Sequence, residues 1–457
     1  MLLTIEKLVY GGDGLARLPA EESTTPARAT PERAGEPGQG RGKAVFVPFT
    51  LAGEQVEATI GGHKPGFARA RLERVVAPSA QRIDPACPYF LRCGGCHYQH
   101  TGYEHQIEIK TAILRENLAR LAKLDWPGEI VAHRSQPWNY RNRARLQVRH
   151  QPEFSLGYYA HGSHHVVPVE QCPISSPLIN RALAGLCKFG REGGFAPAFR
   201  EVELFADASD EQLSLAFHVD ASRVPSDGVV GIDGEKLRRE LPEMAGMSLF
   251  ATEPASKPSR EPRLVGSVAA QTDAKSGQGA SLLYAVVGTH YRVSPGAFFQ
   301  TNRFLADKMV ELVTGGRAGK LALDLYAGVG LFATVLARSF ERVVAVEASE
   351  FSVADLKHNV PANVEVVRDT TERYLARRSG QPDLVVADPP RAGLGDKVVS
   401  ALGKLGAPRL TYLSCDPATL ARDLRGLIAA GYRVEEIHLL DLFPQTYHIE
   451  SLVQLVK

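Results

Sequence analysis

Residues 320–331 read Lys320-Leu321-Ala322-Leu323-Asp324-Leu325-Tyr326-Ala327-Gly328-Val329-Gly330-Leu331. The apolar run as far as Tyr326 is typical of a buried strand, and the two glycines after it indicate a loop whose backbone can approach a ligand closely. A second apolar run, 343–346, ends at Glu347, about as far along the chain as the acid that binds ribose hydroxyls in nucleotide-binding folds. Alone, this pattern fits either a dinucleotide or S-adenosylmethionine.

The region from about residue 293 to residue 457 alternates strand-like and helix-like patterns. We expect a helix over 303–313 and strands over 320–326, 343–347, 383–387 and 409–413. Strict alternation predicts a parallel, doubly wound sheet. Asp388-Pro389-Pro390-Arg391 follows one of these strands and would fix a rigid hydrogen-bond acceptor beside a cofactor, which argues against a dehydrogenase.

Two further residues of this region are candidates for chemistry. Cys415 lies between the strand that ends at Leu413 and a helix predicted to begin at Pro417. Ligands bind at such strand ends in open α/β sheets, and a helix N-terminus would favour the thiolate, although a buried structural cysteine is the alternative. Glu450, in a last strand over 447–453, is flanked by apolar residues and is a candidate base, with a solvated strand-end glutamate as the alternative.

The first 77 residues alternate apolar and polar positions between glycine turns, for example over 43–50 and 54–60. This pattern predicts a small β-barrel. Residues 19–42 interrupt it with Pro, Glu, Ser, Thr, Arg and Gly, so we expect a disordered loop there.

Three cysteines follow in the spacing Cys87-x5-Cys93-x2-Cys96, and Cys172 is a fourth. Closely spaced thiols indicate a metal or a cluster, and four thiolates favour 4Fe-4S. Zinc is the rival, because one of the nearby histidines, His97 or His100, could complete a Cys3His site. The sixth cysteine, Cys187, has an apolar helical setting typical of a core residue.

A cationic strand is predicted between these cysteines, after a helix over 105–124. Arg143, Arg145 and Arg149 alternate with apolar residues, close to Trp138 and Tyr140. Arginines beside aromatic rings suit phosphate contact and base stacking in RNA, and an ordinary solvated strand face is the alternative. Residues 253–280 are polar and indicate a surface insertion.

Length and composition agree with several soluble domains. The chain has 457 residues, and its net charge of only +2 means that any nucleic-acid binding must come from local basic patches. No apolar run approaches the roughly 18 residues of a membrane span, and the first residues lack a secretory layout. We therefore expect a cytoplasmic protein, whose cysteines are ligands or nucleophiles rather than disulfides. No obligate protein partner is evident.

An ordered set of motifs strongly resembles the RNA uracil-C5 (5-methyluridine) methyltransferases, a family of class I S-adenosylmethionine-dependent enzymes. The motifs are Ser294-Pro295-Gly296-Ala297-Phe298-Phe299-Gln300-Thr301-Asn302, Asp324-Leu325-Tyr326-Ala327-Gly328, Asp388-Pro389-Pro390-Arg391, Ser414-Cys415-Asp416-Pro417 and His448-Ile449-Glu450-Ser451. Together with Tyr10–Arg17 and the four cysteines, they look most like the bacterial 23S rRNA branch, which has a TRAM domain and a 4Fe-4S cluster.

The resemblance implies a multi-domain α/β fold. Residues 1–77 would form an OB-like TRAM barrel that binds RNA, 78–292 a central α+β domain with the cluster and further RNA contacts, and 293–457 a Rossmann-like methyltransferase domain.

The resemblance also implies residue roles. Cys415 matches the nucleophile and Glu450 the proton acceptor. The positions that match the S-adenosylmethionine and uracil pocket are Gln300, Tyr326, Glu347, Asp388 and, more weakly, Asp369, and those that match the cluster ligands are Cys87, Cys93, Cys96 and Cys172. Some relatives carry Asn where Leu331 stands, so one contact to the cofactor is absent here.

Three alternatives stay open at this point. The substrate could be tRNA rather than rRNA. The chain could be a non-catalytic RNA-binding or assembly protein, against which Cys415 and Glu450 argue. It could also be a methyltransferase that positions an amino group with Asp-Pro-Pro, which would need no cysteine nucleophile.

Overall fold

The computed structural model describes residues 1–18, 42–223, 231–252, 263–269 and 280–457. They form two compact units. The first contains residues 1–91, 95–113 and 445–448, and the second contains 92–94, 114–444 and 449–457. Apart from Gly42, the predicted disordered loop 19–42 lies outside the described residues, as does most of the predicted insertion 253–280.

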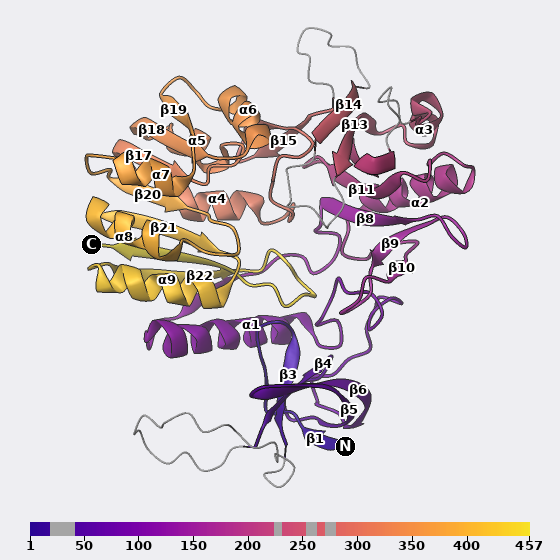
Figure 1. Cartoon of the computed structure of the whole chain (residues 1–457). Coiled ribbons are helices and arrows are strands. Elements are labelled where there is room, and N and C mark those ends of the chain that lie inside the picture. The colour runs from indigo at the N-terminus through magenta and orange to yellow at the C-terminus, as the bar shows by residue number, and fades with distance from the viewer. Residues whose placement is uncertain (19–41, 224–230, 253–262, 270–279) are drawn as a thin grey trace. The chain divides into compact units, whose positions relative to one another are not determined.

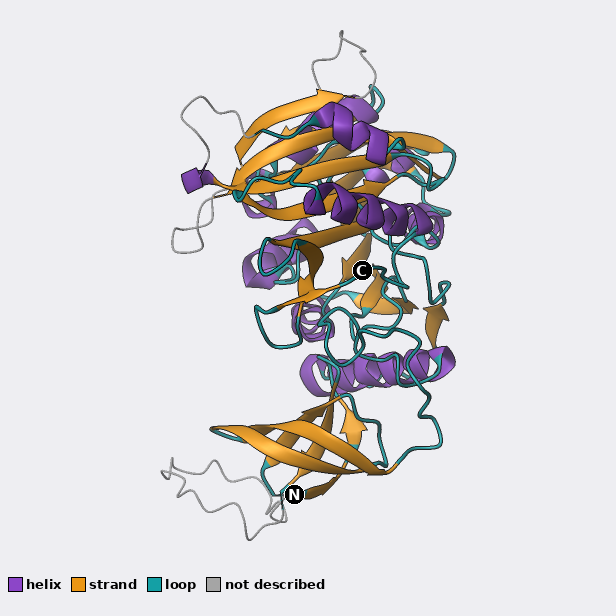
Figure 2. Cartoon of the chain, turned by 90° about the vertical axis from the view of Figure 1, so that its right-hand side faces the viewer, coloured by secondary structure: helices purple, strands orange, loops and turns teal. Residues whose placement is uncertain are grey.

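The first unit contains a six-stranded sheet in the order β1-β5-β6-β4-β3-β2. Its strands are β1 Leu2–Thr4, β2 Lys7–Leu8, β3 Asp13–Arg17, β4 Ala44–Pro48, β5 Gln55–Lys64 and β6 Phe67–Ala77. All neighbours are antiparallel except β4 and β6. Figure 2 shows how strongly this sheet twists. Alternate side chains such as Val45, Val47 and Val56 form its apolar core, which explains the alternation in the sequence.

Helix α1 spans Tyr103–Asn117 and continues as one π-helical segment, Leu118–Ala122. The helix predicted over 105–124 is therefore confirmed to within two residues at each end. Within the first unit, the side chain of Gln106 exchanges two hydrogen bonds with Gln445, one from Gln106 Nε2 to Gln445 Oε1 (3.0 Å) and one from Gln445 N to Gln106 Oε1 (2.9 Å). The carbonyl of Gln445 also accepts from the backbone N–H groups of His97 (2.8 Å) and Tyr98 (2.9 Å).

The second unit contains a seven-stranded sheet in the order β10-β9-β8-β11-β12-β13-β14. Its strands are β8 Arg143–Arg149, β9 Ser155–Tyr159, β10 Val166–Pro168, β11 Phe199–Ala206, β12 Leu213–Asp220, β13 Met244–Thr252 and β14 Arg263–Ala269. Its helices are α2 Pro177–Arg191, the 3-10 turn Ala221–Arg223 and α3 Gly234–Glu240. Cys187 is buried in α2, as predicted.

Within the predicted surface insertion 253–280, residues 263–269 form strand β14, which pairs with β13. An edge strand needs partners on one side only, and main-chain hydrogen bonds supply them with little apolar surface.

The cationic face predicted on β8 is present but largely neutralised. Glu203 on the neighbouring strand β11 forms an ion pair with Arg143 at 3.1 Å, and Glu201 pairs with Arg145. Such cross-strand pairs satisfy the arginines within the sheet. The sequence pattern gave no sign of these partners because they lie more than fifty residues further along the chain, and phosphate contact through this face would have to displace them.

A larger sheet of eight strands has the order β19-β18-β17-β20-β21-β23-β22-β7. Its strands are β7 Ile130–His133, β17 Gly319–Leu325, β18 Phe340–Glu347, β19 Val364–Arg368, β20 Leu384–Ala387, β21 Arg409–Ser414, β22 Arg433–Leu440 and β23 Glu450–Val456. The helices are α4 Ala306–Thr314, α5 Leu331–Leu336, α6 Glu350–Asn359, α7 Thr371–Arg377, α8 Gly395–Leu405 and α9 Pro417–Ala429, and the hairpin β15 Leu282–Val286 with β16 Thr289–Val293 precedes them.

Figure 1 shows these strands and helices alternating in the orange and yellow part of the chain. The parallel sheet predicted from this alternation is confirmed for β17 to β21. It is wrong for β23, which runs antiparallel to both β21 and β22. The reason is the connection over residues 441–449, which has no helix, because only a parallel neighbour needs a crossover. None of the described helices is long and apolar enough to cross a membrane.

Candidate active site

The carboxyl ends of four neighbouring strands carry the predicted site residues. In sheet order, β18 ends at Glu347, β17 leads to Tyr326, β20 leads to Asp388 and β21 leads to Cys415. Because these strands are parallel, their carboxyl ends meet at one edge of the sheet, where ligands bind in this class of fold. The antiparallel strand β23 begins at the same edge with Glu450.

Cys415 and Glu450 lie at the same end of two paired strands. Ser414, the last residue of β21, pairs with Ser451 of β23, and Cys415 and Glu450 are the residues next to this pair. Glu450 acts electrostatically on the Cys415 thiol. The sheet thus brings together the candidate nucleophile and the candidate base, which are separated by more than thirty residues in the sequence.

The electrostatic setting of Cys415 differs from the prediction. Burial, with the nearby carboxyl groups of Glu450 and Asp388, raises the pKa of the Cys415 thiol to about 12, and Arg391 opposes the rise. The expected thiolate is therefore not the favoured form among these protein groups. The helix N-terminus does not offset the effect, because the carboxylate of Asp416 accepts from the amides of Ala418 and Thr419, both at 2.9 Å.

The carboxyl groups around the thiol also favour their protonated forms. Burial raises the pKa of Asp388 to about 7. Burial, together with Asp388, raises the pKa of Glu450 well above its ordinary value, while Arg391 lowers it. A cation that binds beside these acids would stabilise their ionised forms and so lower their pKa values.

Glu347 connects the glycine loop to the end of β18. Its Oε2 accepts from the backbone N–H of Gly328 at 2.8 Å, and its Oε1 accepts from Ala348 (2.8 Å) and Ser349 (2.7 Å). Gly328 and Gly330 have φ of 55° and 93°, a region that glycine enters without steric cost. The carboxylate therefore shapes this loop and keeps lone pairs for a ligand hydroxyl.

Asp324 is a site residue to which the sequence assigned no role. Its side chain is buried, and its Oδ2 accepts from the backbone N–H of Ala333 in α5 at 2.8 Å. Burial raises the pKa of Asp324 to about 8, with contributions from Asp388 and Glu347. The sequence did not mark Asp324 as a site residue, because it is a single acid within the apolar run of β17.

The other predicted cofactor residues surround the same edge. Tyr326 adopts a left-handed conformation (φ 64°), and burial raises the pKa of its hydroxyl, which contacts Thr371, to about 12. Asp369 follows β19, donates its N–H to the carbonyl of Glu347 (3.1 Å) and pairs with Arg377. Gln300 is half-buried in the loop before α4, and its carbonyl accepts from Asn142 at 3.1 Å. Leu331 is buried at the start of α5, in keeping with a packing role.

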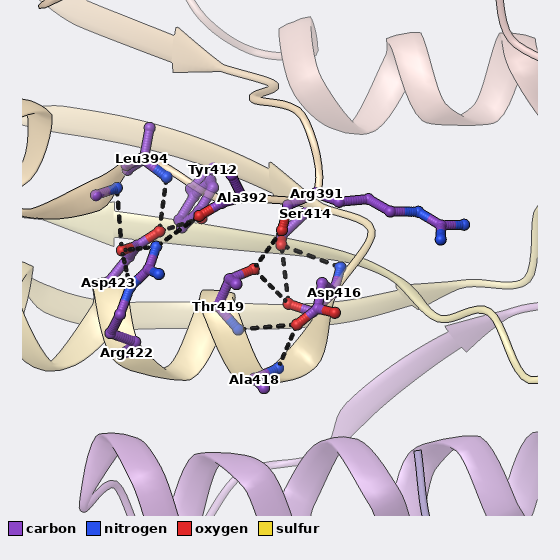
Figure 3. A network of polar contacts seen from close by, with 11 residues as sticks. Arg391, Ala392, Leu394, Tyr412, Ser414, Asp416, Ala418, Thr419, Arg422 and Asp423 are labelled. Atoms are coloured by element: carbon purple, nitrogen blue, oxygen red, sulfur yellow. Dashed lines mark hydrogen bonds and ion pairs between the residues drawn. The ribbon is translucent and has the colours of Figure 1, made fainter. Parts of the chain in front are cut away.

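Helix α9 holds the loop that follows Asp388. Figure 3 shows Thr419, Arg422 and Asp423 pointing from α9 toward this loop. Asp423 Oδ2 accepts from the N–H of Leu394 (2.7 Å), and Arg422 donates to the carbonyl of Ala392 (2.8 Å). Thr419 Oγ1 donates to the carbonyl of Arg391 (3.2 Å). The sequence did not indicate these contacts.

The four candidate metal ligands are distributed between the two units. Cys87 and Cys96 belong to the first, and Cys93 and Cys172 belong to the second, where both lie near Tyr158. All four cysteines are half-buried. Among the described residues, no group of three or more His, Cys, Asp or Glu side chains is arranged to hold a metal ion. The donor type suits a cluster, but the described structure contains no assembled site. His100, a candidate for zinc, is buried, which lowers its pKa to about 4, and its Nε2 lies 3.5 Å from the Thr50 carbonyl.

Comparison with known proteins agrees with this geometry. Residues 282–457 match the family model described as tRNA (Uracil-5-)-methyltransferase. An uncharacterized RNA methyltransferase of Aquifex aeolicus is 32% identical over 99% of this chain and 97% of its own length. The 23S rRNA (uracil(1939)-C(5))-methyltransferase RlmD of Pseudomonas entomophila is 32% identical over 97% of this chain and 95% of its own.

Among solved structures, the tRNA (uracil-54, C5)-methyltransferase of Pyrococcus abyssi, in complex with S-adenosyl-L-homocysteine, has a TM-score of 0.73. Its identity is 23%, and each chain is covered in full. At this identity, the likeness concerns the fold.

Proposed function

Because the chain belongs to the family of RNA uracil-C5 methyltransferases, we propose that it transfers the methyl group of S-adenosylmethionine to C5 of a uridine in 23S rRNA. The observation that carries the proposal is that Cys415, Glu450 and Asp388 meet at one edge of the sheet, where both carboxyl groups act electrostatically on the Cys415 thiol. The RlmD relatives, which cover nearly the whole chain, support rRNA as the substrate.

The chemistry requires a nucleophile because uracil C5 is weakly nucleophilic. The sulfur of Cys415 forms a bond to C6, and the electron pair of the C5–C6 double bond moves to give an enolate. C5 then attacks the methyl group, and S-adenosylhomocysteine leaves. Glu450 takes the C5 proton, the double bond forms again and the C6–S bond breaks, which returns the sulfur as thiolate.

The charges around the site suit each step. The thiol has to lose its proton before it attacks, and both the sulfonium cation and the guanidinium of Arg391 lower the cost of the thiolate. The acids Asp324, Glu347 and Asp388 complement the cationic cofactor. Glu450 has to be ionised to act as base, which Arg391 also favours. The target base has to leave its stack to reach Cys415, so single-stranded or remodelled RNA is the expected substrate.

Two measurements test the function. Purified enzyme incubated with labelled S-adenosylmethionine should place label in 5-methyluridine of 23S rRNA from a strain that lacks the gene. RNA that contains 5-fluorouridine should trap the protein covalently, because fluorine cannot leave C5 as a proton does. Methylation of tRNA instead of rRNA would show that the substrate is tRNA. The family model and the Pyrococcus abyssi enzyme both have tRNA in their names. Label in an amino group, without trapping, would contradict uracil-C5 chemistry.

We also infer that Cys87, Cys93, Cys96 and Cys172 ligate a 4Fe-4S cluster. The close spacing of three of these cysteines in the sequence supports this, as thiolates are the ligands that iron–sulfur clusters take. Such a cluster would hold the chain together or position RNA, because the methyl transfer has no net redox change. Anaerobically purified protein should contain about four irons and four sulfides per chain. Stoichiometric zinc without iron or sulfide would contradict the cluster.

Finally, we propose that residues 1–77 form a TRAM-like RNA-binding module. Phe46 and Phe67 are half-buried neighbours on its surface, with ring centroids 5.5 Å apart. Lys64 Nζ lies 5.9 Å from the ring centroid of Phe67. Aromatic rings beside a cation can stack bases and attract phosphates without reading sequence.

A further inference from the structure

Helix α9 contacts two parts of the candidate active site. Its N-terminus follows Cys415 directly, with Asp416 as the capping residue. Its first two turns carry Thr419, Arg422 and Asp423, which bind the backbone of the loop between Asp388 and α8 (Figure 3). One rigid helix thus sets the position of the nucleophile and of the loop that carries Asp388 and Arg391.

Asp423 is the centre of this arrangement. Its carboxylate is fully buried, yet it accepts at both oxygens. Oδ2 accepts from the N–H of Leu394 (2.7 Å) and from the hydroxyl of Tyr412 (2.8 Å). Oδ1 accepts from the N–H of Gly395 (3.3 Å) and from Nε and Nη2 of Arg422 (2.9 and 2.8 Å). A buried charge is stable only with partners of this number and quality.

The loop is shaped to reach this carboxylate. Gly393 has φ of 74°, and a Cβ atom there would lie 2.4 Å from Asp423 Oδ2 and 2.8 Å from Arg422 Nη2. The loop backbone therefore lies directly against the two side chains, with no space for a side chain of its own. The contact is between fixed groups, so a change at Asp423 is transmitted to the loop.

We propose that Asp423 is a positioning residue, which fixes Asp388 and Arg391 relative to Cys415 and so controls the attack on uracil. This inference rests on the proposed function. Asp388 and Arg391 both act electrostatically on the Cys415 thiol, so their placement affects its reactivity. Displacement of a reacting group by about 1 Å can cost about a hundredfold in rate.

The test compares Asp423→Asn with the wild-type enzyme. The amide keeps the shape, but its nitrogen cannot accept from the loop or from Tyr412. We expect the single-turnover rate of adduct formation with 5-fluorouridine RNA, per trapped active site, to fall by about tenfold to a hundredfold. The dissociation constant of S-adenosylmethionine should change by a smaller factor than this rate, since the glycine loop and Glu347 are untouched and only Asp388 of the cofactor pocket is displaced.

Two further sets of variants separate positioning from stability. Thr419→Val removes the hydroxyl that binds the Arg391 carbonyl, and Thr419→Ser keeps it, so the valine variant alone should react slowly. Thr411→Val, on the same strand as Tyr412, breaks a buried bond to Gln454 (2.7 Å) away from the loop. It should lower the melting temperature but not the rate per active site.

The positioning role of Asp423 would be overturned if Asp423→Asn and Thr419→Val both form adduct at the wild-type rate. The proposed function would still stand, because the wild-type enzyme forms adduct in the same assay. If Asp423→Asn does not fold, a wild-type rate for Thr419→Val overturns the positioning role. A wild-type enzyme that forms no adduct would overturn the proposed function, and this inference with it.

Discussion

Cys415 and Glu450 lie at the same edge of the sheet because β23 runs antiparallel to β21, with Ser414 paired to Ser451. A parallel last strand would direct its carboxyl end, not its first residue, to this edge of the sheet. The antiparallel direction of β23 therefore brings the buried carboxyl group of Glu450 to the edge where Cys415 lies. In the proposed mechanism the two residues have separate roles, since Cys415 makes a bond to carbon and Glu450 removes a proton.

The separation predicts different failures for the two residues. Cys415→Ala should show neither adduct nor methylation, because C5 is never activated. Glu450→Gln keeps the side chain's shape but removes the base, so addition and methyl transfer proceed while elimination stops. This variant should accumulate a methylated RNA–protein adduct, which survives denaturing electrophoresis and carries label from S-adenosylmethionine.

The control is the double variant, Cys415→Ala with Glu450→Gln, which must show no adduct if the bond is to Cys415. Turnover of Glu450→Gln at the wild-type rate would remove Glu450 from the mechanism. So would an inactive variant that binds both substrates and forms no adduct.

The pKa values predict that the affinity for S-adenosylmethionine rises with pH. Asp388 and Asp324, with pKa values of about 7 and about 8, are protonated at low pH and ionise next to the sulfonium. For each proton released, linkage limits the rise in affinity to about tenfold per pH unit. Titration calorimetry at several values between about pH 6 and pH 8 should show this rise in affinity. S-adenosylhomocysteine, which lacks the positive charge, should show a weaker dependence, and Asp388→Asn should flatten the curve. A flat curve for the wild-type protein would contradict the prediction.

The same groups predict how stability changes with pH. Both carboxyl groups bind a proton more tightly in the folded protein than in the unfolded chain, where an Asp has a pKa of about 3.9. Their contribution to stability is therefore complete below about pH 4 and declines as the pH rises toward 7 to 8. Urea unfolding of the ligand-free protein should show this decline across that window, and Asp324→Asn should reduce it.

Gly393, in the loop after β20, and Gly395, the first residue of α8, form a matched pair for a stability test. Gly393 and Gly395 have φ of 74° and 72°, so alanine costs about 1–2 kcal/mol of backbone strain at either position. A Cβ atom at Gly395 has no atom within 4 Å, whereas at Gly393 it overlaps Asp423 and Arg422. Gly393→Ala should thus be less stable than Gly395→Ala by a further ~1–3 kcal/mol in urea unfolding. Equal losses would show that the loop yields easily.

The aromatic pair of the first unit gives a test of RNA binding. Phe67→Ala should weaken RNA binding by roughly fivefold to a hundredfold, since stacking contributes about 1–3 kcal/mol per base. Lys64→Ala should make the affinity less salt-dependent. Neither should alter S-adenosylmethionine binding, which makes cofactor affinity the internal control. Unchanged RNA affinity in both variants would assign RNA binding to other surfaces.

The sequence predicted the parts of the site that follow local rules. An apolar run followed by glycines places Tyr326 and Gly328 after a strand, and the alternation of patterns places Asp388 and Cys415 at one sheet edge. It could not predict the direction of β23, because antiparallel and parallel strands have similar composition. Nor could it predict the protonated thiol, which depends on burial and on carboxyl groups distant along the chain. The arginines of β8 show the same limit, as their partners Glu201 and Glu203 become neighbours only in the folded sheet.

The hydrogen bonds between Gln106 and Gln445 bear on how this protein can be divided experimentally. Residues 445–448 belong to the first unit, although the chain on either side of them belongs to the second. The first unit is therefore not a contiguous stretch of sequence, and no single cut yields it whole. A fragment that stops short of Gln445 would expose the amide of buried Gln106 and the N–H groups of His97 and Tyr98. Expression of the N-terminal part by itself should give an unstable product unless the short segment 445–448 is supplied in trans or grafted onto it.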